Sequence, residues 1–271
     1  MGEAKLKQRK HADILANANG CLYCAGRRKA IQIDHMPPRA MFRMSQRPRG
    51  LEFPCCAECN QGTSRLDVVA TFMTRTFPGI QNDADSAEWD KVMNEVGRVA
   101  PGLPREIMVP PNEMRAMLAS QGIFDENLAA FKADGPILGS HMQAFAAKVG
   151  FALRYEDVGY PVPDAGAVQV RWFTSSENFS GVLPESLLKS VGETKFLKQG
   201  KIDTEGHFEY GWGDFALKPN VRLYYAKFRE AFTIAAFVAD DLKDVPFPVG
   251  QLATFAPGDL TEDLYDRIVD W

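Results

Sequence analysis

Two Cys-x-x-Cys pairs near the start of the chain constrain its fold more than any other feature. Cys21 and Cys24 form the first pair, and Cys56 and Cys59 form the second. Each pair can point two thiolates at one ion, and zinc binds four such ligands as a tetrahedron at about 2.3 Å. Cys55 could replace Cys56, but the spacing to Cys59 favours Cys56. The four cysteines therefore predict a structural zinc ion, Zn2+, with a closed coordination sphere.

The composition is that of a folded protein rather than a disordered or membrane-spanning one. Of the 271 residues, 45% are hydrophobic and 24% are charged, which supplies enough apolar surface for a sizeable core. No apolar run is long enough to cross a bilayer. The first ten residues are basic but do not lead into the apolar core of a signal peptide. We therefore expect a cytoplasmic protein without a membrane partner, in which five cysteines are not a disulfide framework.

The basic residues collect in the N-terminal quarter of the chain. Residues 1–65 carry 12 Lys and Arg against 5 Asp and Glu, whereas residues 66–271 carry 19 against 30. Such an asymmetry allows the N-terminal segment to hold a polyanion, although a charge run of this kind can also be a solvated helix face.

Residue periodicity in the N-terminal quarter predicts two short strands between two helices. A helix over 3–18 ends at Asn19-Gly20, which is a strong turn signal. A strand over 30–33 runs into Asp34-His35, and a second extended segment covers 51–54. A helix begins at Ala57, because Leu66, Val69, Phe72 and Met73 repeat at spacings of three and four.

The remaining chain predicts an α+β fold with a C-terminal antiparallel sheet. Residues 80–133 have helical periodicity with breaks at Pro101-Gly102 and Pro110-Pro111, and residues 141–154 predict a buried helix. Aromatic and β-branched residues predict four strands, over 168–173, 207–217, 221–228 and 232–238. A short helix over 260–271 closes the chain. We divide the chain into residues 1–78 and residues 79–271, the latter a helical connector followed by an α+β module.

Three ordered motifs carry a resemblance to a known family. They are Cys-Leu-Tyr-Cys, then Ile-Asp-His-Met-Pro-Pro-Arg, then Phe-Pro-Cys-Cys-Ala-Glu-Cys-Asn-Gln-Gly-Thr-Ser. Over residues 18–67 the chain resembles the zinc-containing branch of the HNH endonucleases, which includes a phage endonuclease that resolves Holliday junctions. The resemblance implies a zinc-stapled ββα-metal module in residues 1–78 that hydrolyses phosphodiester bonds of DNA.

The resemblance also implies a role for particular residues. Asp34 and Asn60 would bind one catalytic Mg2+ or Mn2+ ion, both of which prefer oxygen ligands. His35 would act as the base that activates a water, because a neutral imidazole accepts a proton near pH 7. Arg39 and Arg65 lie near the motifs and would contact phosphate.

One position departs from the family pattern. Gly50-Leu51 stands where related sequences carry the middle Asn, which fixes the backbone around the catalytic His. Gln32 or Gln46 could replace that Asn. The departure favours a second reading, a zinc-stabilised module that binds nucleic acid or a protein without cleavage. An RNA-directed nuclease is a third reading that the residues leave open.

The acidic C-terminal region contains no interpretable motif. Its fusion to a small nuclease suggests a role in specificity, assembly or regulation, for example sensing a ligand during defence against foreign DNA. This role is compatible with a homo-oligomer and with a regulatory ligand or protein partner of the C-terminal domain.

Overall fold

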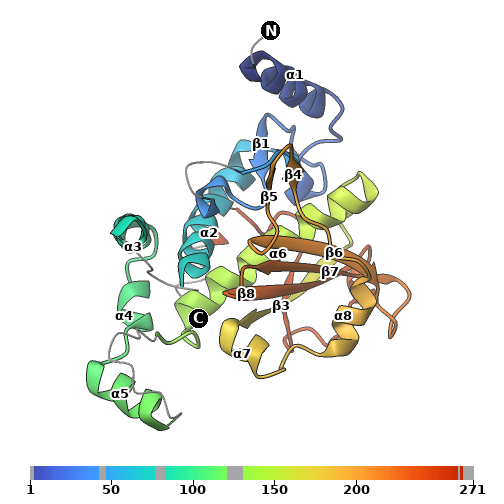
Figure 1. Ribbon diagram of the computed structural model, residues 1–271. Coiled ribbons are helices and arrows are strands. Elements are labelled where there is room, and N and C mark those ends of the chain that lie inside the picture. The colour runs from blue at the N-terminus through green and yellow to red at the C-terminus, as the bar shows by residue number, and fades with distance from the viewer. Residues whose placement is uncertain (1–2, 43–46, 77–82, 121–130, 262, 265–271) are drawn as a thin grey trace.

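The computed structural model shows a mixed α+β protein with antiparallel sheets (Figure 1). The structure describes residues 3–42, 47–76, 83–120, 131–261 and 263–264. Among these residues, no helix combines the length and the apolar character that a membrane crossing requires. Gln46, the predicted domain boundary after residue 78 and most of the predicted closing helix over 260–271 lie outside the described residues.

The N-terminal part contains a two-stranded ribbon followed by a long helix. In chain order its elements are α1 (Glu3–Ala16), η1 (Leu22–Cys24), β1 (Gln32–His35), η2 (Arg39–Met41), β2 (Glu52–Cys55) and α2 (Ala57–Arg75). β1 and β2 pair antiparallel, and His35 lies opposite Glu52. β1 begins two residues later than predicted, so Asp34 and His35 lie within the strand rather than after it. The predicted helix from Ala57 is confirmed.

Three helices connect this part to the rest of the chain, as the helical periodicity predicts. They are α3 (Asp83–Val99), α4 (Leu103–Ile107) and α5 (Pro111–Ser120). The two predicted breaks are confirmed, because α3 ends just before Pro101-Gly102 and α5 begins at the second proline of Pro110-Pro111.

The C-terminal part is built on a five-stranded antiparallel sheet with the order β6-β7-β8-β3-β9. Its strands are β3 (Ala167–Thr174), β6 (Phe208–Asp214), β7 (Val221–Phe228), β8 (Phe232–Ala239) and β9 (Ala253–Phe255). The first four confirm the predicted strands, whereas β9 is too short to give a pattern. The sequence also did not predict α7 (Ser175–Phe179), α8 (Glu185–Val191), β4 (Lys198–Gln199), β5 (Ile202–Asp203) and η4 (Leu242–Asp244).

Helix α6 (Pro136–Val158) lies between the N-terminal elements and the sheet (Figure 1). On one side, Phe151 and Tyr155 of α6 pack edge-on against Tyr23 of η1 and Phe53 of β2. On its other side α6 packs against the sheet, for example through ring contacts of Phe145 with strand β7. One buried hydrophobic cluster therefore includes residues of η1, the ribbon, α2, α6 and the sheet. The predicted burial of the helix over 141–154 is confirmed.

Candidate active site

The four predicted cysteines converge at the base of the ribbon. Cys21 precedes η1 and Cys24 is its last residue, whereas Cys56 caps the N-terminus of α2 and Cys59 lies in its first turn. All four are buried, and their sulfur atoms lie within 4.8 Å of one another. This cluster is placed to bind a metal ion such as zinc. It joins the segment before β1 to the helix after β2.

The four thiols perturb one another strongly. A hydrogen bond with Cys24 raises the pKa of Cys21 to about 12, and the same contact lowers the pKa of Cys24 to about 2. The hydrogen bond with Cys21 also raises the pKa of Cys59. Neighbouring thiols thus resist ionising together, and a bound cation would supply the positive charge that four thiolates require.

The chain before β1 turns tightly to bring the first cysteine pair into place. Gly20 and Gly26 both have positive φ angles, of 86° and 75°. A Cβ atom on Gly20 would lie 2.3 Å from the carbonyl oxygen of Gly26. A larger residue at either position would therefore push the two sides of this turn apart.

Asp34 and His35 are adjacent in sequence but point to opposite faces of the ribbon. Successive side chains of a strand alternate between its two faces. Asp34 is buried on the inner face, toward α2 and α6, whereas His35 is half-buried on the outer face. The structure therefore separates two residues that were predicted to serve one centre.

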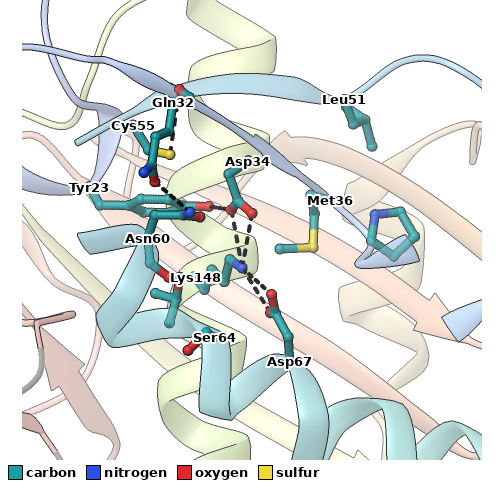
Figure 2. Close-up of polar contacts among 12 residues, drawn as sticks. Tyr23, Gln32, Asp34, Met36, Leu51, Cys55, Asn60, Ser64, Asp67 and Lys148 are labelled. Atoms are coloured by element: carbon teal, nitrogen blue, oxygen red, sulfur yellow. Dashed lines mark hydrogen bonds and ion pairs between the residues drawn. The ribbon is translucent and has the colours of Figure 1, made fainter. Parts of the chain in front are cut away.

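On the inner face, a buried lysine occupies the space around Asp34 (Figure 2). The ammonium of Lys148 on α6 lies 3.3 Å from Oδ1 and 3.1 Å from Oδ2 of Asp34. It also lies 2.8 and 2.9 Å from the two carboxylate oxygens of Asp67 on α2. The hydroxyl of Tyr23 donates a hydrogen bond of 2.5 Å to Asp34. Asp34 thus has protein partners on both oxygens.

The electrostatics of this network hold Lys148 charged. Burial alone would lower the pKa of Lys148, but the negative charges of Asp34 and Asp67 outweigh burial and raise it. Burial also raises the pKa of Asp67 to about 7, although the charge of Lys148 acts against this shift. The side chain of Lys148 is fully shielded from solvent, so its ammonium cannot swing away into water.

Asn60 lies on the first turns of α2 and faces a different partner. Its side-chain amide donates a hydrogen bond of 2.7 Å to Oε1 of Gln32 on β1. Because Lys148 already bonds both oxygens of Asp34, the Mg2+ or Mn2+ ion predicted at Asp34 and Asn60 does not fit the side chains as placed. The ammonium of Lys148 occupies the position beside Asp34 where the resemblance implies a divalent cation.

On the outer face, two histidines and a glutamate come together. His35 and Glu52 face each other across the ribbon, and His11 reaches them from α1. Nε2 of His11 lies 3.9 Å from Oε2 of Glu52, and Nε2 of His35 lies 4.0 Å from Oε1 of Glu52. The sequence does not predict a role for His11 and Glu52, because no local spacing relates α1 to β2.

Two exposed cations lie beside this group. Nζ of Lys10 lies 3.0 Å from Oε2 of Glu52, and Nη2 of Arg39 donates to Nε2 of His35 at 2.5 Å. Burial lowers the pKa of His35 to about 4, and the charges of Arg39 and Arg47 act in the same direction. Burial would raise the pKa of Glu52, but the hydrogen bond and charge of Lys10, together with the charges of the two histidines, outweigh burial and lower it. Near pH 7 the outer face therefore offers a neutral imidazole and a carboxylate.

Arg47 fixes the backbone around His35. Its guanidinium donates to the carbonyl oxygens of Met36 and Pro37, at 2.6 and 2.7 Å, and to that of Gly50, at 2.7 Å. These bonds tie the residues that follow His35 to the position where the family pattern has its middle Asn. The sequence offers Gln32 and Gln46 for this task and gives no sign of Arg47. Gln32 instead bonds Asn60.

Of the two predicted phosphate contacts, the structure places only Arg39 beside His35. Arg39 also lines a cleft of about 560 Å³ between η2, α2 and α3, together with Arg75, Lys91 and Asp67. Arg65 is exposed on α2, where its charge acts on His141 of α6. The cleft thus connects the outer face at Arg39 with the buried network at Asp67.

Comparisons with known proteins do not identify the chain. No family model, curated protein or solved structure matches it.

Proposed function

We propose that the chain is a nuclease that hydrolyses phosphodiester bonds of DNA, with its reaction centre on the outer face of the ribbon. The observation that carries this proposal is the group around His35. A half-buried imidazole lies next to a carboxylate at Glu52 and a guanidinium at Arg39. This proposal assigns the reaction centre to His35, on the face of β1 opposite to Asp34.

The chemistry of these side chains suits an attack on a phosphodiester. His35 is neutral near pH 7 because burial lowers its pKa to about 4. Its Nε2 lone pair accepts from Arg39 in the structure, and it would activate a water once Arg39 turns to the phosphate. The planar guanidinium of Arg39 matches two phosphate oxygens and would neutralise their charge. The excess of basic residues in 1–65 favours a polyanionic substrate. By resemblance, the products would carry a 5′ phosphate and a 3′ hydroxyl.

In this proposal the cysteine cluster binds zinc and has a structural role. Four thiolates close the coordination sphere, so a zinc ion there has no open position for a water. The ion would hold η1 against the start of α2 and thereby fix the ends of both ribbon strands. Removing the ion would disturb the position of His35, although the ion itself would take no part in the reaction.

A cleavage assay with two histidine variants tests the proposal. The full chain with bound zinc is incubated with plasmid DNA and with RNA, in Mg2+ or Mn2+. We expect DNA cleavage that falls by about 100-fold or more in His35→Ala, because general acid-base groups contribute about that much. His207→Ala, at an exposed histidine of the C-terminal part, is the matched control and should cut normally. Zinc content should be equal in all three proteins. Equal cleavage by wild type and His35→Ala would refute the proposed centre, and cleavage of RNA alone would change the substrate.

A second candidate function is binding of nucleic acid without cleavage. The observation that favours it is the ion pair between Lys148 and Asp34, which leaves the inner face without a site for the family's divalent ion. In the same assay, salt-dependent DNA binding with no cleavage in any divalent ion would establish this function instead.

A further inference from the structure

The outer face of the ribbon carries a second set of metal ligands, distinct from the cysteines. We propose that His11, His35 and Glu52 bind one divalent transition-metal ion, with Mn2+ as the probe that tests it. This inference rests on the proposed function and deepens it, because the ion would be the cofactor of that centre.

The donor atoms have the identity and spacing that such an ion needs. Two imidazole nitrogens and one carboxylate oxygen lie within 4.8 Å of one another. Ligands about 2.1 Å from a common ion are separated by roughly 3 to 4 Å, so the group needs only small side-chain movements to close around it. Two histidines and one carboxylate form a recurring site for divalent transition metals and leave positions open for water and substrate. Imidazole ligands also favour these metals over Mg2+.

The positions of the three ligands in the fold are well defined. His35 and Glu52 are directly opposite each other in the ribbon, whose base is held by the cysteine cluster. The Glu52 side chain is only 6% exposed, and the two histidine side chains are 16% and 24% exposed. In the structure the ammonium of Lys10 accompanies this nearly buried carboxylate, and a bound metal ion would take over that role. A bound ion would also attach α1 to the ribbon.

The cations beside these ligands can turn away into solvent, and in this respect the site differs from the inner face. The side chain of Lys10 is 49% exposed and Arg39 is exposed as well, so both can turn into solvent at little cost. Lys148 on the inner face is fully shielded and has no such route. Arg39, once displaced from Nε2 of His35, would be free to bind the phosphate of a substrate. In the metal-bound protein the lone pair of His35 would be bound to the ion, so the ion rather than the imidazole would lower the pKa of a bound water.

Mn2+ binding to the zinc-loaded full chain, measured by electron paramagnetic resonance, tests the site. We expect one Mn2+ per chain, with the affinity reduced by about tenfold or more in Glu52→Gln and in His11→Asn. Glu58→Gln, an exposed acidic residue of the same region, is the matched control and should bind Mn2+ like wild type. Because His11 lies at a helix surface, its variant keeps the test valid if Glu52→Gln folds poorly.

Two outcomes would overturn the inference. One is the absence of Mn2+ binding in wild type. The other is a loss of binding in Asn60→Ala but not in Glu52→Gln, which would return the ion to the predicted inner site. If cleavage still depends on His35 in that case, the proposed function stands without this metal site. If Mn2+ binds as expected and no nucleic acid is cut, the site stands and the proposed function falls.

Discussion

At the scale of single residues, Asp34 shows how one strand position determines which chemistry is available. Its carboxylate faces the interior, where the nearest cation is an ammonium that the chain itself supplies from α6. The two partners of such a buried ion pair depend on each other, because either one alone would be a buried charge without a counter-ion. The outer neighbour His35 lies against the exposed guanidinium of Arg39, which is free to turn away from it.

Replacing Lys148 tests this dependence. Lys148→Met keeps most of the side-chain volume but leaves Asp34 and Asp67 without their cation. We expect the free energy of unfolding, measured with urea, to fall by about 3 to 5 kcal/mol, as when one partner of a buried pair is removed. Lys189→Met removes an exposed lysine whose partner Glu185 is also exposed, and it should leave stability nearly unchanged.

A double variant separates charge from packing in the same experiment. Adding Asp67→Asn to Lys148→Met removes one uncompensated carboxylate, so part of the lost stability should return. If the double variant were no more stable than Lys148→Met, the loss would come from packing, and the electrostatic account of the network would be wrong.

The sequence could predict the cysteine cluster but not the partners of Asp34. Cys21, Cys24, Cys56 and Cys59 form two local pairs whose spacing alone indicates a shared ion. Lys148 lies 114 residues away from Asp34, and only the packing of α6 brings them together. The sequence contained one unused signal. A lysine within a helix that is apolar on most sides must be paired when that helix is buried.

At the scale of elements, the segment that precedes β2 shows that a side chain outside the family pattern can hold the backbone after His35. The longer helices and the four longer strands followed from periodicity, because each has a strong pattern of its own, whereas α7 and α8 are too short to give one. The strand β1 is only four residues long, and its start was predicted two residues too early. Asp34 and His35 point to opposite faces because both lie within the strand. Residue propensities do not determine where so short a strand begins. Arg47 then supplies the hydrogen bonds that the family pattern assigns to an Asn.

Arg47→Lys should loosen this connection. Lysine keeps the charge but cannot donate simultaneously to the carbonyl oxygens of Met36, Pro37 and Gly50. We expect a loss of about 1 to 3 kcal/mol in the free energy of unfolding, because buried carbonyls lose their donors. The amide of Met36, which donates to Leu51 at 3.0 Å, should exchange faster with solvent deuterium. Arg49→Lys, two residues along, is the control, and unchanged protection of Met36 in Arg47→Lys would refute this positioning role.

At the scale of the whole molecule, α6 links η1, the ribbon and the network around Asp34 to the C-terminal sheet. Its Lys148 completes the network around Asp34, and its aromatic residues cover η1 and β2 while its opposite side packs on the sheet. Composition and periodicity could separate a cysteine-rich part from a strand-rich part, but they could not predict this shared helix. The contact requires α6 to approach the sheet closely, which it does at Gly150.

Two glycines of α6 test whether the parts are coupled. A Cβ atom at Gly150 would lie 2.7 Å from Val168 and 2.8 Å from Ala236, so Gly150→Ala should force α6 away from the sheet. We expect a loss of about 1 to 3 kcal/mol from overpacking. Gly139 lies in the same helix, and outside its own helix backbone no described residue comes within 4 Å of the carbon that Gly139→Ala adds. This variant should stabilise the protein by up to about 1 kcal/mol through helix propensity. Unfolding is followed by tryptophan fluorescence in a Trp89→Phe, Trp271→Phe background, which leaves Trp172 and Trp212 of the sheet as probes. Zinc release to a chelator reports on the cysteines. Because α6 joins both parts, the two transitions should shift together in each variant. A shift of the fluorescence transition alone in Gly150→Ala would show that the cysteine cluster and the ribbon fold independently of α6.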